Sequence, residues 1–327
     1  MIKNTKKTFA LIRLPKEEKI FFLAEENGGK NAYSFTSFDN SKKRVLYFSD
    51  FHEVDVSQLE NNFDIPLNIN HNTQTVSKND YLKLLQKTLR FLQEGETHKV
   101  VISREKWIEK TNIQPLKSFL FLCRKYPNSF CHLNFWGKEE IWLGATPEIL
   151  GTYENSVFQT MALAGTLPDD DSYQWQEKER MEQQFVTDYI QEKLCYFSEK
   201  ITTHGAKDLH LGHVKHLATC FSARLEDENL LPALIQSLHP TPAVCGLPLK
   251  TSRDFILENE GYDRTFYAGY IGLETSESKK YFVNLRSGKL YQNGAMLYVG
   301  GGITAQSDPE KEWQETELKS RFVEESL

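Results

Sequence analysis

The most restrictive feature of the sequence is an apolar run that ends in consecutive glycines and leads into a helix. Gly300, Gly301 and Gly302 end the run. Asp308 and Pro309 follow at a spacing that suits a helix N-cap and the first helical position. Adjacent glycines leave backbone N–H groups open to close approach by an anion. The stretch therefore predicts a strand, a turn and a helix, with an anion site at the glycines.

The helix that follows carries two glutamates on one face. Glu312 and Glu315 are one turn apart, and Lys319 continues the same face a further turn on. Two interpretations are open. With Glu310 and Glu317 they form a solvated acidic face that favours the positive helix N-terminus, or they hold a metal that bridges the protein to an anionic substrate. The solvated face is the simpler interpretation unless the chain supplies a second set of ligands.

Composition excludes several classes of function. The chain has 327 residues and a net charge of −6, without a basic face that would bind nucleic acid. Its five cysteines form no C-x-x-C pair, which fits a reducing compartment. No apolar run is long enough to span a membrane. We therefore expect a cytoplasmic protein that binds neither nucleic acid nor membrane.

A strand and a stiff turn present two candidate catalytic groups. In the run HKVVISR, Val100 and Ile102 share one face, so Lys99 points to the other. Lys99 either reaches solvent or, if it is desolvated, can serve as a general base. Pro147 fixes the backbone just before Glu148 at the end of another strand. A carboxylate held there either caps a short helix or takes part in catalysis.

A second helix, from Trp175 to about Lys200, repeats the pairing of glutamates. Its apolar residues recur at helical spacing and predict the buried face: Met181, Phe185, Tyr189 and Leu194. Glu179 and Glu182 lie one turn apart on this helix. Two such pairs in one chain, each after a strand end that contains glycine, predict a site for a hard cation.

Several further positions suit contacts with a small polar ligand. Gly165 and Thr166 form a turn after a strand of small residues, and His216 lies on a strand as an inward polar group. Arg286 ends an apolar strand, where it either binds a carboxylate in bidentate fashion or forms an ion pair. The proline-rich loop HPTPAVCGLP, which contains Ala243, suits a rigid wall against a ligand.

Taken in chain order, these motifs resemble the chorismate-utilising enzymes, which include isochorismate, salicylate, anthranilate and aminodeoxychorismate synthases. The resemblance runs from about Lys78 to Arg321 and rests on HKVVISR, GATPEIL, TMALAGT, EKERMEQQFV, VKHLAT, HPTPAVCGLP, FVNLR and VGGGITAQSDPEKEWQET. It implies an α+β fold, a single large domain of two antiparallel-rich β-sheets packed face to face with helices outside. Residues 1–75 would be a β-rich scaffold part of that domain, and residues 76–327 the chorismate-binding catalytic region. It also implies chorismate as substrate and Mg²⁺ as cofactor.

Within that family the sequence is most similar to isochorismate synthases, those of the menaquinone type above all. Aminodeoxychorismate synthases commonly carry a nucleophilic lysine where this chain has Ala164. Anthranilate synthases, which use ammonia, usually carry a threonine where it has Ala243, whereas a base at the position of Lys99 is typical of isochorismate synthases, which use water. Met181 and Val244 depart from the family's usual histidine and leucine, and we expect them only to tune the pocket.

The resemblance also implies a role for each candidate residue. Lys99 would deprotonate the attacking water, and Glu148 would protonate the departing hydroxyl. The metal ligands would be carboxylates, with Glu182 and Glu315 bound to Mg²⁺ directly and Glu179 and Glu312 through its waters. The remaining positions would contact the substrate: Arg286 and the N–H groups around Gly301 at the pyruvyl carboxylate, and Lys319, Gly165, Thr166, His216 and Ala243 around the ring.

Two alternatives stay open. A salicylate synthase would add a pyruvate-lyase step in the same pocket, and a chorismate-binding subunit would need a glutaminase partner. The pairing of Lys99 with Glu148 favours a monomer that acts without a glutaminase. Such an enzyme would serve menaquinone synthesis, or else a siderophore or salicylate route.

Overall fold

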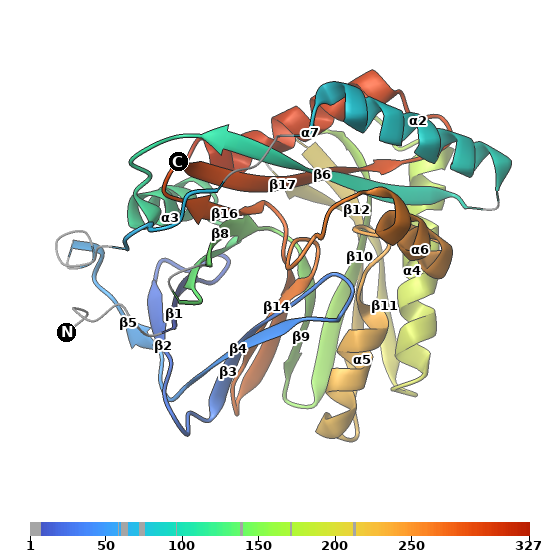
Figure 1. The fold of residues 1–327 in the computed structure, drawn as a ribbon. Helices are drawn as coiled ribbons and strands as arrows, with labels where there is room; N and C mark the ends of the chain where they lie inside the picture. The colour runs from blue at the N-terminus through green and yellow to red at the C-terminus, as the bar shows by residue number, and fades with distance from the viewer. Residues whose placement is uncertain are drawn as a thin grey trace.

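Two antiparallel β-sheets form the frame of the protein in this computed structural model (Figure 1). The structure describes residues 8–57, 59, 65–71, 76–95, 97–137, 140–170, 172–211 and 214–327. Every pairing between neighbouring strands in these ranges is antiparallel. The expected two-sheet α+β architecture is therefore confirmed.

Each sheet mixes strands from distant parts of the chain. In spatial order, sheet A consists of β13 Gly246–Leu247, β6 Lys99–Glu109, β17 Gly294–Ile303, β16 Ser287–Tyr291, β8 Ile141–Thr146, β7 Phe130–Phe135, β1 Phe9–Arg13, β2 Phe21–Ala24 and β5 His52–Glu53. In the same order, sheet B consists of β11 Ile201–Leu211, β12 Val214–Arg224, β10 Val157–Pro168, β9 Ile149–Glu154, β15 Ser278–Val283, β14 Tyr270–Glu274, β3 Asn31–Thr36 and β4 Lys43–Phe48. The first strands of the chain, β1 to β5, thus contribute to both sheets.

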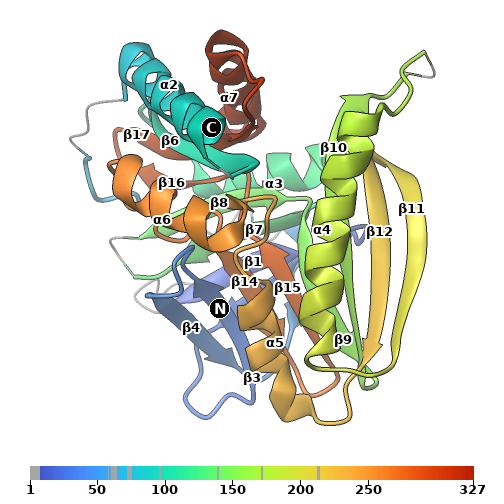
Figure 2. The ribbon, with the colours of Figure 1, turned by 90° about the vertical axis from the view of Figure 1, so that its right-hand side faces the viewer.

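Helices lie on the outside of this frame. Their bounds are α2 Lys78–Glu94, α3 Pro115–Lys125, α4 Glu177–Cys195, α5 Leu231–Leu238, α6 Leu249–Asn259 and α7 Pro309–Glu324, and a 3₁₀ turn, η1, covers Glu228–Leu230. Helices α2 and α7 lie side by side over β6 and β17 (Figures 1 and 2). Helix α4 runs along β10 and β12 (Figure 2).

The main core lies between the two sheets. Phe130 of β7 stacks on Phe282 of β15, with ring centroids 4.2 Å apart, and Phe35 of β3 packs against Trp142 of β8. All four side chains are fully buried, so each sheet removes one apolar face from water by covering the other. A smaller core lies on the other face of sheet A, where Phe119 of α3 is buried.

The sequence predictions for the two faces of β6 and for the start of α7 are confirmed. Val100 and Ile102 of β6 are fully buried, whereas Lys99 on the other face is only partly buried. Asp308 is the N-cap of α7, and its carboxylate accepts a hydrogen bond from Lys311 N at 2.9 Å. Pro309 occupies the first position of that helix, where its missing N–H costs nothing.

The predicted buried face of α4 is only partly right, since Leu194 is fully buried and Tyr189 partly buried but the other two members are exposed. Met181 and Phe185 are 51% and 40% exposed, and Val186 and Ile190 are buried instead. The buried face consists of Gln183, Val186, Ile190 and Leu194. Gln183 is a polar residue in a core position, which donates to Ala162 O at 3.0 Å, so apolar spacing alone does not reveal this face.

Candidate active site

Two short segments cross from one sheet to the other, and they lie side by side. The first joins β8 of sheet A to β9 of sheet B and carries Glu148, and the second joins β15 of sheet B to β16 of sheet A and carries Arg286. Val283 N donates to Glu148 O at 3.0 Å, Thr146 Oγ1 to Val283 O at 2.5 Å, and Ala145 N to Arg286 O at 3.1 Å. These bonds bring a carboxylate and a guanidinium together where the sheets meet.

Glu148 has the electrostatics of an acid that holds its proton near neutral pH. Burial raises its pKa to about 7, and the charges of Lys99 and Arg286 and a contact with Thr241 oppose that rise. Both cations must therefore lie close to the carboxyl. The perturbation joins burial with specific charged partners, which is typical of a catalytic site.

Lys99 approaches the same place from β6. A Cβ at Gly302 would lie 2.6 Å from Lys99 Cε and 3.3 Å from Nζ, so the lysine side chain runs across the bare face of that glycine. Strand β13 and helix α6 pack behind it, because Gly246 of β13 pairs with Val100 and Ser252 Oγ of α6 donates to Lys99 O at 2.9 Å. Glycine at position 302 thus gives Lys99 its path toward Glu148.

The consecutive glycines lie inside β17 rather than in a turn after it. Gly301 pairs with Ile102 of β6, whereas β16 pairs with β17 only as far as Leu297. The N–H groups of Val101 and Ser103 donate away from β17, to Cys245 O and Glu260 Oε1. In an antiparallel ladder the N–H of Ile102, and that of its partner Gly301, must then point toward each other's strand.

By the same alternation, the backbone groups of the two neighbouring glycines point to the opposite edge of β17. Gly300 and Gly302 direct their backbone groups away from β6, beyond the end of β16, and Gly300 O accepts from Lys319 Nζ at 2.9 Å. The open N–H groups expected around Gly301 are therefore those of Gly300 and Gly302. Gly301 has a different use, which is to leave room for carboxylates.

The carboxylates of α7 lie against Gly301 in a manner that fits Mg²⁺. A Cβ at Gly301 would come within 2.9 Å of Glu312 Oε2 and 3.8 Å of Glu315 Oε1. Carboxylate oxygens are the hard donors that Mg²⁺ prefers, and glycine keeps the space beside them clear. In this structure Glu315 pairs with Lys319 at 2.5 Å. Burial lowers the pKa of Lys319, and Glu315 opposes that shift.

Arg286 connects the two parts of the site. Its guanidinium lies over the ring of Phe322 in α7, 4.7 Å from the centroid. Burial lowers its pKa, and the charges of Tyr267, Glu315 and Glu148 act in the opposite direction. Arg286 therefore interacts electrostatically with both Glu148 and Glu315 of α7, which suits a group that binds an anionic substrate between them.

The glutamates of α4 contribute less to the site as it stands. Glu179 Oε2 accepts a hydrogen bond from Gln176 N at 3.0 Å and so caps its own helix. The side chain of Glu182 lies outside the described residues. Among the residues that the structure does describe, no three metal-ligating side chains gather closely enough to hold an ion.

Gly165 and His216 form one structural unit. Gly165 has φ +70° at a bulge in β10, and a Cβ there would meet Glu179 Cβ at 3.3 Å. The carbonyl of Gly165 can only accept, so His216 Nδ1–H donates to it at 2.9 Å. His216 thus supports this bulge beside α4, and the turn expected at Gly165 and Thr166 is a bulge inside β10 instead. The side chain of Thr166, the next residue, lies outside the described ones.

A cavity of about 250 Å³ opens beside Glu148. Thr241 and Ala243 line it from the loop before α6, and Met161 and Leu163 line it from β10. Ala243 was expected at the pocket, whereas Thr241 was missed. The prolines of the loop indicated a wall but not which side chains face inward.

Arg264 is a second residue that the sequence reasoning missed, and it holds this loop in place. It is buried, pairs with Glu260 at 2.5 Å, and donates to Val244 O at 3.0 Å and Val101 O at 2.7 Å. The bonds tie the loop to β6, the strand that carries Lys99. An isolated arginine near a run of aromatics gave no sign of this role in the sequence.

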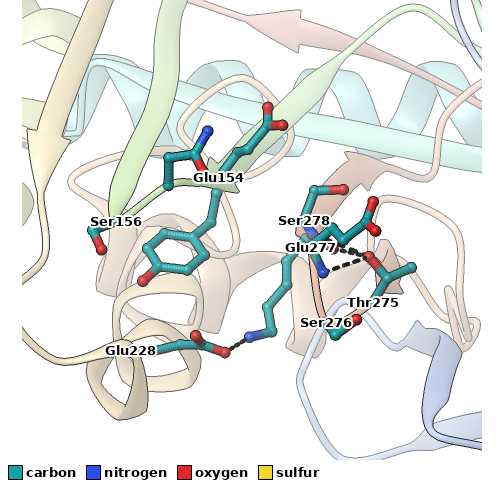
Figure 3. Close-up of a pocket in the computed structure, with 10 residues that line it drawn as sticks. Glu154, Ser156, Glu228, Thr275, Ser276, Glu277 and Ser278 are labelled. Carbon is teal, nitrogen blue, oxygen red and sulfur yellow. Dashed lines mark hydrogen bonds and ion pairs between the residues drawn. The ribbon is translucent and has the colours of Figure 1, made fainter.

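A second hollow, of about 470 Å³, lies at the far end of β9 from Glu148 (Figure 3). Turns after β9 and β14 form it, Lys279 in its lining pairs with Glu228, and Thr275 Oγ1 accepts from Ser278 N. None of the predicted site residues lines it. It is therefore separate from the candidate active site.

Comparison with known protein families identifies the family of this chain. A family model described as chorismate binding enzyme matches residues 33–327. The chain belongs to this family. The match covers both crossings, the Lys99 strand and α7, so the residues assembled above are all within the family region.

Curated members of the chorismate-binding family resemble this chain over most of its length. Isochorismate synthase MenF of Escherichia coli K12 is 31% identical over 254 residues, which cover 74% of this chain and 59% of that protein. The salicylate biosynthesis isochorismate synthase of Pseudomonas aeruginosa is 34% identical over 259 residues, 72% of this chain and 52% of that protein. The chain thus spans little more than half the length of these two relatives.

Solved structures support the fold of this chorismate-binding enzyme. The structure of Escherichia coli MenF, the menaquinone-specific isochorismate synthase, matches with a TM-score of 0.83 at 22% identity, covering 99% of this chain and 90% of that one. Anthranilate synthase component I of Streptococcus pneumoniae matches with a TM-score of 0.74 at 16% identity, covering 99% and 93%. No helix among the described residues could span a membrane.

Proposed function

We propose that the protein is a Mg²⁺-dependent isochorismate synthase, which converts chorismate reversibly to isochorismate. The observation that carries this proposal is the meeting of Lys99, Glu148 and Arg286 where the two sheets join. A base, a protonated acid and an anion-binding group are what an exchange of hydroxyl positions on an anionic ring requires. The named relatives are isochorismate synthases as well.

The reaction requires two proton transfers, one from the attacking water to the enzyme and one from the enzyme to the departing hydroxyl. In the proposed step the Lys99 side chain takes a proton from water as the water oxygen bonds to C2 of the ring. The ring double bonds shift, the C4–O bond breaks, and Glu148 gives its proton to the departing hydroxyl, which leaves as water. Burial holds the pKa of Glu148 at about 7, so much of the enzyme carries this proton at neutral pH.

Two carboxylates of the substrate need partners, and the site offers two. Arg286 and the open backbone of Gly300 and Gly302 would hold the pyruvyl carboxylate. Glu312 and Glu315, together with Glu179 and Glu182 of α4, would hold Mg²⁺. When bound, the metal supplies positive charge for the ring carboxylate.

The proposed nucleophile is water, and the enzyme would act as a monomer without a glutaminase subunit, in the cytoplasm. Its pathway would be menaquinone synthesis, or else a siderophore or salicylate route. The small side chain of Ala243 in the cavity lining supports the use of water, because the resemblance places a threonine there in enzymes that use ammonia.

The test is the product spectrum of the purified chain. With chorismate and Mg²⁺ but no ammonium salt, we expect isochorismate as the product by chromatography, and none after addition of EDTA. Isochorismate supplied instead should return chorismate. Salicylate with pyruvate would identify the lyase alternative, and anthranilate formed only with ammonia would contradict the choice of water.

A further inference from the structure

A chain of buried polar side chains joins the two sheets behind the crossing that carries Arg286. Tyr33 Oη of β3 donates to Asn134 Oδ1 of β7 at 2.7 Å. Asn134 Nδ2 donates to His132 Nδ1 at 2.7 Å, so this ring nitrogen accepts. All three side chains are fully buried, and burial lowers the pKa of His132 to about 3. The imidazole is therefore neutral, with its only proton on Nε2.

That Nε2–H faces the end of the Arg286 crossing. Gly144 of β8 pairs with His132 on one side and with Ser287 on the other. A Cβ at Gly144 would lie 2.5 Å from His132 Nε2 and 2.8 Å from Ser287 Cβ, so the ring and the serine meet above the same glycine. The Asn284 side chain is close as well, since a weak hydrogen bond between it and the ring partly offsets the lowering of the His132 pKa.

Three buried polar atoms at this place have no hydrogen-bond partner at normal distance and angle among the described residues. They are His132 Nε2, Asn284 Oδ1 and Ser287 Oγ. Buried polar atoms in proteins are nearly always bonded, to protein or to an ordered water. One donor beside two acceptors is the complement of a single water molecule, which accepts one hydrogen bond and donates two.

We propose that one buried water links His132 Nε2–H to Asn284 Oδ1 and Ser287 Oγ, and that His132 is thereby a positioning residue for Arg286. Asn284 and Ser287 bracket the crossing, whose sharpest point is Arg286 with φ 50°. A non-glycine residue keeps that left-handed conformation only when its surroundings hold it. The link thus fixes the backbone from which the guanidinium reaches Glu148 and Glu315.

This inference rests on the proposed function only for the role of Arg286 in holding the substrate. The kinetic test replaces His132 with phenylalanine, which fills the space but cannot donate. We expect KM for chorismate to rise about tenfold, the loss of one buried hydrogen bond of about 1.4 kcal/mol, with a much smaller change in kcat. His132→Gln, whose amide can accept from Asn134 and donate at its other end, should restore most of the affinity.

A double substitution separates positioning from general damage. In the Arg286→Lys background, His132→Phe should add little to KM, because the group it positions has already been changed. Thr88→Val in α2 is the matched control, since it also removes a buried hydroxyl that bonds to a backbone carbonyl. It should lower thermal stability but leave KM unchanged. Equal and additive effects of His132→Phe in both backgrounds would overturn the proposal.

A measurement that needs no turnover distinguishes this inference from the proposed function. In protein labelled with ¹⁵N-arginine, the Nε–H signal of Arg286, assigned by its loss in Arg286→Lys, should shift or broaden in His132→Phe and stay in place in Thr88→Val. An unmoved signal in His132→Phe contradicts the positioning role, even if the enzyme makes isochorismate. A shifted signal in a protein that makes no isochorismate supports the positioning role and contradicts the function.

Discussion

The candidate site has two halves that differ in how firmly their side chains are held. One half lies on the two segments that cross between the sheets, and the other lies on helices α4 and α7. Glu148 and Arg286 sit on segments that hydrogen-bond to one another between buried strands, so their positions are set by the frame. Glu179 and Glu315 sit on helix surfaces and already have partners, Gln176 N and Lys319 Nζ. One half is preorganised, and the other must exchange protein partners for a ligand.

This difference predicts which kinetic property each substitution should change. A preorganised proton-transfer pair acts at once on a substrate that enters, and its loss removes catalysis without much change in binding. Carboxylates that leave Lys319 or a helix cap to bind a metal contribute only the difference between two sets of interactions. Changes to Lys99 and Glu148 should therefore affect kcat, changes to Arg286 should affect KM, and changes to the carboxylates of α4 and α7 should affect the metal requirement.

The largest effect is expected at Lys99. Lys99→Ala removes the proposed base and should lower kcat by roughly 10²–10⁴, the range typical of general base catalysis. Lys106 lies further along the same strand and pairs with Glu317 at 2.9 Å, away from the site, so Lys106→Ala is the control and should keep its kcat. Steady-state rates with saturating Mg²⁺ decide the matter. A Lys99→Ala enzyme with wild-type kcat would remove Lys99 from the mechanism.

The next effect concerns the metal. Glu315→Gln should raise the Mg²⁺ concentration for half-maximal activity by at least about 100-fold, because it replaces a proposed direct ligand, whereas outer-shell partners cost roughly 10–100-fold. Glu317 on the same helix pairs with Arg104 and Lys106 instead. Glu317→Gln should therefore lose stability but keep the Mg²⁺ dependence of the wild type. If both variants respond alike to Mg²⁺, Glu315 is not a ligand.

The raised pKa of Glu148 should also make the stability of the protein depend on pH. Burial raises the pKa of Glu148 to about 7 in the folded state, against an ordinary value of 4.5. Its contribution to stability is complete below the unfolded pKa and is lost as pH rises through about 7. Glu148→Gln does not ionise, so its free energy of unfolding relative to wild type should grow by about 2 kcal/mol between about pH 5 and 8. Denaturant unfolding at both pH values would test this, and a constant difference would refute the raised pKa.

The smallest effect is expected at Glu179, the capping residue of α4. Glu179→Ala should lower stability by about 1 kcal/mol through loss of the bond to Gln176 N. Its effect on the Mg²⁺ requirement should be smaller than that of Glu315→Gln. Thermal unfolding together with a Mg²⁺ titration measures both quantities. An effect on Mg²⁺ equal to that at Glu315 would make α4 an equal partner in metal binding.

Short-range patterns in the sequence predicted much of the frame. The N-cap at Asp308, the two faces of β6 around Lys99 and the pairing of glutamates on α7 follow from spacing within one element. The family resemblance supplied the two-sheet fold, which periodicity alone does not specify. Local rules sufficed wherever one element determines its own geometry.

Tertiary contacts decided the rest. The turn after Thr146 and the turn before Ser287 look like ordinary strand ends, and only the assembled sheets make them neighbours that cross between layers. Gln183 takes a core position on α4 and bonds to β10, whereas Met181 and Phe185 are exposed. The role of Gly301 likewise depends on the ladder with β6. None of these contacts leaves a periodic signal in the chain.

The most direct test of the account is the origin of the oxygen in the product. Lys99 and Glu148 are proposed to activate an incoming water and to release the old hydroxyl, so turnover in water enriched in heavy oxygen should place one heavy atom on C2 of isochorismate. Mass spectrometry at early conversion, before the reverse reaction scrambles the label, reads this out. Label in every molecule of new product is the predicted result. Unlabelled isochorismate would mean that the original hydroxyl migrates, and would contradict the roles given to both residues.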